Sequence, residues 1–167
     1  MECDPRRLTA LIPSRTDPTD VPFVPPTLRL SLEQFRGIVA HCYDGLPNEA
    51  CGVLAGPVEG AGEPTGDVTT IFPCTNTDAS ARTYTVDSRD LLRAMRDAES
   101  RGEELIGVWH SHTHTDAYPS DTDVRQAMEP NWIYAIVSLK QAEPILRAYR
   151  IRDGQTTEVD IDVADLA

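Results

Sequence analysis

Basic residues are scarce in this 167-residue sequence. Lysine and arginine together number 15 against 27 aspartates and glutamates, so the formal net charge is −12. This charge repels phosphate backbones, and nucleic acid is therefore not expected as a partner. No window is apolar and long enough to span a bilayer, and the N-terminus lacks the apolar core of a secretory signal. The composition predicts a cytoplasmic protein that binds neither nucleic acid nor membrane.

The four cysteines lack the paired CxxC spacing of thiolate zinc sites and thioredoxin-like motifs. Cys42, Cys51 and Cys74 fall in or beside predicted elements, where a buried thiol behaves as a small apolar side chain. Cys51 lies two residues from Glu49, so a thiol nucleophile that works with a histidine stays an alternative.

The N-terminal part of the chain differs in composition from the rest. Residues 1–26 hold six of the 13 prolines among polar and charged residues, which predicts a disordered or extended arm. Residues 27–167 are enough for one domain with a proper core. The sequence contains no internal repeats.

Strand and helix patterns alternate along this domain. Strands are predicted at 28–30, 50–56, 68–72, 84–86, 105–109, 132–138, 145–152 and 156–163. A turn-rich hairpin connection is predicted at 60–66, and helices are predicted from Ser31 to about Gly45, from Asp87 or Ser88 to Gly102, and from Ser120 onward. The second helix is expected to bury a face of Leu91, Leu92, Met95 and Ala98. This order favours an α/β fold with one curved mixed sheet and helices packed on its faces.

Two histidines follow directly on the apolar run 105–109. Side chains two apart on a strand point to the same side of the sheet. His110 and His112 can therefore present their imidazoles together while Ser111 faces away. This arrangement supplies two candidate metal ligands.

A helix start follows these histidines after a polar loop. Ser120 and Asp123 have the spacing of a capping box at the first turn of a helix. From this turn Asp123 can reach back as a third ligand. Two imidazoles and one carboxylate, with a fourth position left to water, typify a catalytic zinc site. Each residue alone has a plainer explanation, as a solvated histidine or a helix cap, but the combination favours the metal site.

The same residues carry a resemblance to a known family. The sequence resembles the signature of the JAMM metallopeptidases, which are the catalytic branch of the MPN domains. The matching residues are His110-Ser111-His112, then Ser120 after seven residues, and Asp123 after two more. That family also has an upstream glutamate ahead of a short apolar strand that ends in glycine. Glu49, just before residues 50–56, is similar to this setting. The resemblance implies the same α/β fold, similar in outline to cytidine deaminases.

The resemblance also implies a mechanism. A zinc ion held by His110, His112 and Asp123 would activate water at neutral pH. Glu49 would orient that water, take its proton and pass it to the departing amine. Ser120, together with the metal, would stabilise the oxyanion of the tetrahedral intermediate. The implied reaction is amide hydrolysis.

One departure and one closer likeness refine this comparison. Many members have proline directly after the His-x-His pair, whereas Thr113 and His114 follow it here. His114 could compete for metal, although a solvated loop histidine is favoured. Thr113 and the run Ala117–Val124 look closer to a bacterial subgroup, the peptidases that release cysteine from a cysteinylated sulfur-carrier protein. This likeness implies a ubiquitin-like carrier with a Gly-Gly tail, joined at its C-terminus to cysteine, as substrate and partner.

Two further hypotheses stay open. A broader isopeptidase or peptidase of the same family would act on other ubiquitin-like or peptide tails. A non-catalytic MPN scaffold would have the fold without the chemistry, but such members usually lack motif residues that are present here. A deaminase is disfavoured because the His-x-Glu and Pro-Cys-x-x-Cys elements are absent.

Overall fold

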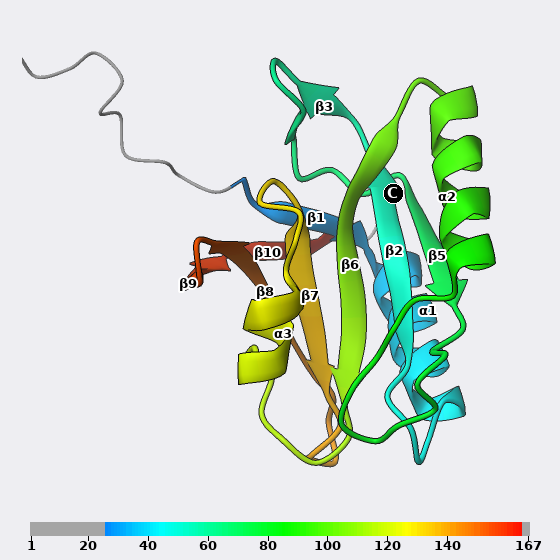
Figure 1. Ribbon diagram of the computed structural model, residues 1–167, viewed down its shortest axis with the longest axis vertical. Coiled ribbons are helices and arrows are strands. Elements are labelled where there is room, and N and C mark those ends of the chain that lie inside the picture. Colours follow the sequence, from blue (N-terminus) through cyan, green and yellow to red (C-terminus); the bar gives the residue numbers. More distant parts are fainter. Residues whose placement is uncertain (1–25, 165–167) are drawn as a thin grey trace, which may run out of the picture.

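The structure, a computed structural model, describes residues 26–164 (Figure 1). The predicted arm therefore lies outside the described residues except for Pro26. The helices are α1 (Leu32–Asp44), α2 (Ser88–Ser100) and α3 (Asp121–Gln126). The strands are β1 (Leu28–Ser31), β2 (Cys51–Gly56), β3 (Val58–Glu59), β4 (Glu63–Pro64), β5 (Thr70–Cys74), β6 (Glu104–His112), β7 (Ile133–Ser138), β8 (Ile145–Arg152), β9 (Gln155–Val159) and β10 (Ile161–Ala164).

Six strands form one mixed sheet in the order β5-β2-β6-β7-β8-β9. β6 pairs with β7 in parallel and with β2 antiparallel. β1 and β10 make a separate parallel pair, and β3 and β4 form a small hairpin in the predicted turn-rich connection. The predicted α/β fold, a single mixed sheet flanked by helices, is confirmed.

Helices cover both faces of this sheet (Figure 1). α1 packs with β1 on one face, in a core cluster that contains Ile38, Leu54 and Trp109. α2 packs on the other face, where Ala94 lies in a cluster with Val53. α3 lies over β7 on the α2 face (Figure 1).

Trp109, which precedes His110 in β6, packs on the α1 face of the sheet and is fully buried. A Cβ at Gly52 would lie 2.4 Å from the Cζ2 atom of the Trp109 ring and 2.5 Å from the Phe72 carbonyl oxygen, so the strand needs glycine there. His41 meets the Trp109 ring edge-on at 5.3 Å, and its Nε2 lies 3.3 Å from the Cys74 carbonyl oxygen. His41 is thus half-buried against the core and lies outside the site.

The predicted strand at 84–86 is wrong. A single bridge joins Val86 to Asn76. Around this bridge, Thr77 N–H donates to the Thr85 carbonyl and Asp87 N–H donates to the Thr75 carbonyl (2.9 Å each). The Asn76 side chain adds two contacts, because its Oδ1 accepts from Thr85 N–H (3.0 Å) and its Nδ2 donates to the Thr83 carbonyl (3.0 Å). This segment is therefore a loop held by a short backbone pairing and by one amide side chain.

The end of the last hairpin also differs from the prediction. β9 stops at Val159, and β10 leaves the sheet to pair with β1. At this point Leu28 N–H donates to the Asp160 carbonyl (2.8 Å), so the chain after β9 pairs with β1 and does not continue beside β8. The returning strand β5 begins and ends two residues later than predicted.

α2 begins at its predicted N-cap, Asp87, but presents a different face to the core. Ala94 and Ala98 are buried, whereas Leu92 and Met95 are 46% and 42% exposed. Small alanines let the helix approach the sheet closely, which turns the larger side chains outward. The predicted buried face was correct only in part.

The cysteines in the described chain are buried and free. Burial raises the pKa of the Cys51 thiol to about 12, so this group stays protonated at neutral pH. A thiol has to ionise to act as a nucleophile. The structure therefore supports the packing role and disfavours Cys51 as a nucleophile.

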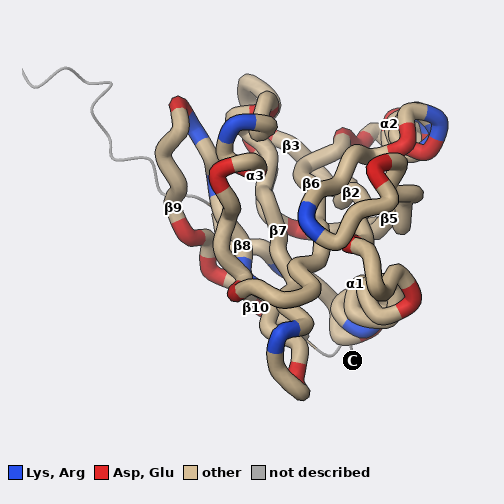
Figure 2. The backbone as a smooth tube through the Cα atoms, turned by 60° about the horizontal axis from the view of Figure 1, so that its bottom comes forward, with Lys and Arg blue, Asp and Glu red and all other residues tan. Residues whose placement is uncertain are grey.

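Acidic side chains are spread over α1, α2 and β9 (Figure 2). This distribution reflects the formal charge of −12 over the whole chain. Within residues 26–164, no helix combines the length and apolar character needed to cross a membrane.

Candidate metal centre

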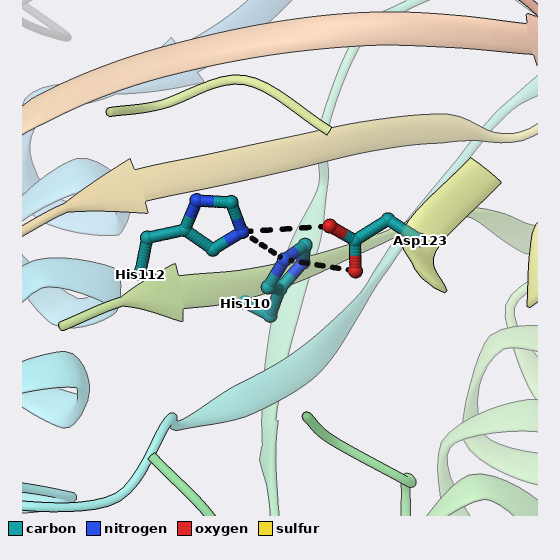
Figure 3. Close-up of side chains that lie close together, drawn as sticks. All are labelled: His110, His112 and Asp123. Atoms are coloured by element: carbon teal, nitrogen blue, oxygen red, sulfur yellow. Dashed lines mark hydrogen bonds and ion pairs between the residues drawn. The ribbon is translucent and has the colours of Figure 1, made fainter. Parts of the chain in front are cut away.

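β6 delivers its two histidines to the same side of the sheet, as predicted (Figure 3). The Nε2 atoms of His110 and His112 lie 3.1 Å apart. Ser111 points to the opposite face, where its Oγ accepts from Ala50 N–H (2.8 Å). Both imidazoles are buried, with 1% and 4% of their surface exposed.

Asp123 reaches the histidines from the first turn of α3 (Figure 3). Its Oδ1 lies 3.4 Å from His110 Nε2, and its Oδ2 lies 3.5 Å from His112 Nε2. The predicted capping box holds this carboxylate, because Ser120 N–H and Oγ–H both donate to Asp123 Oδ2 at 2.6 Å, and Asp123 N–H donates to Ser120 Oγ. Asp123 is thus both a cap and the third member of the group.

The arrangement of these three side chains fits a metal ion. Their candidate ligand atoms all lie within 4.8 Å of one another. Ligands about 2.0–2.1 Å from one tetrahedral ion, as for zinc, lie about 3.3 Å apart. The two imidazole nitrogens here lie 3.1 Å apart, and each lies within 3.5 Å of a different oxygen of the Asp123 carboxylate, so the three side chains converge on a space in which one ion could be held.

The charge states also suit a metal site. Burial lowers the pKa of His110, which keeps this imidazole neutral and able to coordinate. Burial would raise the pKa of Asp123, but its bonds with His110, His112 and Ser120 outweigh burial and hold this pKa well below its usual value. The carboxylate is therefore ionised at neutral pH.

The remaining nitrogens of the two rings have different surroundings. His112 Nδ1 lies 2.8 Å from the Asp116 carbonyl, to which it can donate, so that Nε2 is left to face the site. His110 Nδ1 is buried and has no hydrogen-bond partner among the described residues. Instead, the Tyr84 ring stacks on His110, with centroids 4.3 Å apart and planes inclined by 22°.

Glu49 lies beside this group, just ahead of β2. Cys51 pairs with His110 in the sheet, which places Glu49 across from His112 on the same face. Glu49 is 6% exposed. Burial raises its pKa to about 7, an effect that His112 opposes and Asp123 reinforces. Its carboxyl can therefore both accept and release a proton near neutral pH.

A loop between β5 and α2 closes the site on the Glu49 side. Asn76 Nδ2 donates to the Glu49 carbonyl (2.9 Å), and Glu49 N–H donates to the Ser80 carbonyl (2.8 Å). The contacts of Asn76 and Tyr84 could not be predicted from the sequence, because neither residue stands at a motif spacing. His114 does not join the group; it is exposed, and its Nδ1 lies 2.7 Å from Thr113 Oγ1.

We expect Tyr84→Leu to lower metal affinity about tenfold, within the range measured when groups behind a metal ligand are removed. The stack fixes the plane of the His110 ring, and without it the ring must be ordered on binding. Competition against a chromophoric chelator measures the change. Tyr84→Phe should keep wild-type affinity, and Tyr43→Leu on α1 serves as the control. Equal affinity of Tyr84→Leu and wild type would show that the stack does not position His110.

Residues 31–152 match a protein family described as prokaryotic homologs of the JAB domain. The chain belongs to this family. The CysO-cysteine peptidase of Mycobacterium tuberculosis is 43% identical over 131 residues, which cover 78% of this chain and 86% of that protein. These findings confirm the JAMM/MPN family that the motif resemblance indicated.

Solved structures agree with the fold. The solution structure of DSY2949 from Desulfitobacterium hafniense is 33% identical, with a TM-score of 0.72 over 82% of this chain and 92% of that one. AF2198, a JAB1/MPN domain protein from Archaeoglobus fulgidus, has a TM-score of 0.52 at 16% identity and covers 81% of this chain and 98% of its own. At that identity AF2198 supports the JAB1/MPN fold alone.

Proposed function

We propose that this JAB-domain protein is a zinc-dependent hydrolase that releases cysteine from the C-terminal glycine of a ubiquitin-like sulfur-carrier protein. The observation that carries the proposal is the convergence of His110, His112 and Asp123 within 4.8 Å, in a chain 43% identical to a CysO-cysteine peptidase. Buried Glu49 beside this group supplies the remaining chemistry.

Zinc is the metal that best suits this donor set. Two imidazoles and one carboxylate leave one tetrahedral position open, as in catalytic zinc sites. When bound, the ion would supply Lewis acidity that lowers the pKa of coordinated water to about 7. The chain holds the ion through groups whose orientation is fixed by β6 and by the capping box of α3.

Glu49 acts first as general base and then as general acid. With its pKa near 7, the carboxylate takes a proton from the attacking water and returns it to the departing amine. Its backbone is held on both sides, since its carbonyl accepts from Asn76 and its N–H donates to Ser80. The carboxyl therefore stays beside the ligand group through both transfers.

Ser120 stabilises the oxyanion that forms at the scissile carbonyl. Its hydroxyl now donates to Asp123 Oδ2, so it has to turn toward substrate to do so. We expect Ser120→Ala to fold and bind zinc but to lower kcat by about 100-fold, the lower end of the effect of one such donor. Steady-state kinetics and thermal melting separate the two roles. A lower melting temperature with normal kinetics would leave only the helix-cap role, whose loss costs about 1 kcal/mol.

The carrier tail enters extended. Such a tail can add as a strand beside a sheet edge, where main-chain hydrogen bonds bind it without regard to side chains. A Gly-Gly end suits a narrow approach to a site in which both imidazoles are buried. The segments that border the site, residues 75–87 and 113–120, carry no inserted helix or strand, which suits a small leaving group.

The decisive experiment is an intact-mass measurement. A Gly-Gly-tailed sulfur carrier that bears a C-terminal cysteine is incubated with zinc-loaded protein, and Glu49→Gln serves as the control. Loss of one cysteine with wild type alone would support the hydrolase, its substrate and the role of Glu49. An unchanged mass with fully loaded wild type would reject the cysteine adduct as substrate. A panel of other ubiquitin-like tails then tests the broader isopeptidase, and inactivity on all of them would favour the scaffold.

A further inference from the structure

The loop of residues 75–87 crosses the carboxyl end of β6 and the start of β2 (Figure 1). Three consecutive residues are tied to this end of the sheet or to one another. The Ser80 carbonyl accepts from Glu49 N–H (2.8 Å), and the Ala81 carbonyl accepts from Thr113 Oγ1–H (3.2 Å). Arg82 N–H then donates to Ser80 Oγ (3.1 Å). The backbone of Arg82 is thus held between the general base and the segment that follows the two histidines.

Within the described residues, no opposite charge pairs with the positive charge of Arg82. Its side chain is exposed, and no carboxylate of residues 26–164 forms an ion pair with it. The other cations on segments that border the site already have contacts. Arg89 lies 3.8 Å from Asp87, Lys140 lies 3.0 Å from Asp116, and Arg125 donates to Thr122 at 3.0 Å. Among the described residues that border the site, Arg82 is therefore the cation available to a ligand.

The position of Arg82 corresponds to the leaving-group side. Glu49 returns its proton to the departing nitrogen, so the leaving group has to lie on the Glu49 side, where Ser80 and Arg82 are held. An α-amino acid carries its carboxylate only two bonds from that nitrogen. A lysine joined through its side chain has methylene groups there instead.

We propose that Arg82 binds the free α-carboxylate of the released amino acid and selects α-linked amino acids over lysine isopeptides. The inference rests on the proposed function and extends it to the leaving group. The chain has a formal charge of −12, which opposes the binding of an anionic leaving group unless a local cation offsets it. A guanidinium can hold a carboxylate through two parallel hydrogen bonds.

The test compares two adducts of the same carrier, one ending in cysteine and the other in cysteinamide. The amide keeps the scissile bond and the thiol but removes the negative charge. Wild type should prefer the acid by about tenfold to 100-fold in kcat/KM, the range for a hydrogen bond to a charged group. Arg82→Gln should lose this preference through a higher KM for the acid and should cleave the amide at the wild-type rate.

Two further variants sharpen the result. Arg82→Lys keeps the charge and should retain part of the preference. Arg36→Gln makes the same charge change as Arg82→Gln on α1, across the sheet, and should behave as wild type.

An equal loss on both adducts in Arg82→Gln would overturn the inference, because Arg82 would then act on the carrier or on the stability of the protein. Equal cleavage of the two adducts by wild type would reject the inference alone. Wild type that cleaves neither adduct would reject the proposed function and the inference with it.

Discussion

Glu49→Gln should lower kcat by at least about 1,000-fold and leave the metal content unchanged. Glutamine keeps the shape of the side chain but can neither take a proton from water nor return one to the amine. Each such proton transfer contributes about 100-fold to 10,000-fold to a rate. Because Glu49 stands beside His110, His112 and Asp123 and is not a member of that group, zinc should still bind. Zinc analysis of the purified variant, next to its kinetics on the carrier adduct, measures both quantities.

The melting temperature provides an internal control for this variant. Burial raises the pKa of Glu49 to about 7, above the ordinary value of 4.5 for a glutamate, so the folded protein binds this proton more tightly than the unfolded chain. The ionised carboxylate therefore lowers stability as pH rises from about 4.5 through 7. Metal-free Glu49→Gln should melt at or above the temperature of metal-free wild type at pH 8, and exposed Glu33→Gln should show no change. An inactive variant that melts lower would point to misfolding as the cause of its inactivity.

The sequence was sufficient to predict the parts of the site that depend on local geometry. His110 and His112 share a face because alternation along a strand is fixed by the backbone. Asp123 reaches them because a capping box sets the start of α3. The position of Glu49 was predictable only through the family resemblance, since its neighbour across the sheet, His112, is distant in sequence.

The contacts made by the loop between β5 and α2 could not be predicted. The whole of α2 and most of β6 separate Tyr84 from His110 in the sequence, so their contact depends on the tertiary fold. A β-rich run at 84–86 indicated a strand, but this segment forms only a single bridge with Asn76, whose side chain satisfies part of its backbone. A local pattern cannot reveal that a side chain will meet part of a segment's backbone and that the pairing will stop after one bridge. The face of α2 was likewise decided by how closely Ala94 and Ala98 approach the sheet.

Asp123→Asn should abolish both metal binding and turnover. The neutral amide is a weaker ligand than a carboxylate, and it offers one acceptor oxygen where Asp123 uses two. Oδ1 now faces His110, and Oδ2 accepts from Ser120 while it faces His112. We expect metal affinity to fall by more than about 100-fold, beyond the effect of removing a group behind a ligand. Chelator competition gives the affinity, and elemental analysis gives the content after purification.

Asp121→Asn is the matched control for this variant, because it makes the same charge change in the same turn of α3 on an exposed side chain. It should retain both metal and activity, so that a difference between the two variants reports on coordination and not on the helix start. His112→Ala should reproduce the loss from the β6 side, since it removes a ligand and leaves the cap of α3 intact. If Asp123→Asn were free of zinc and still active, the assignment of His110, His112 and Asp123 as ligands of a catalytic metal would be wrong. The chemistry would then have to be sought in Glu49 and the loop that covers it.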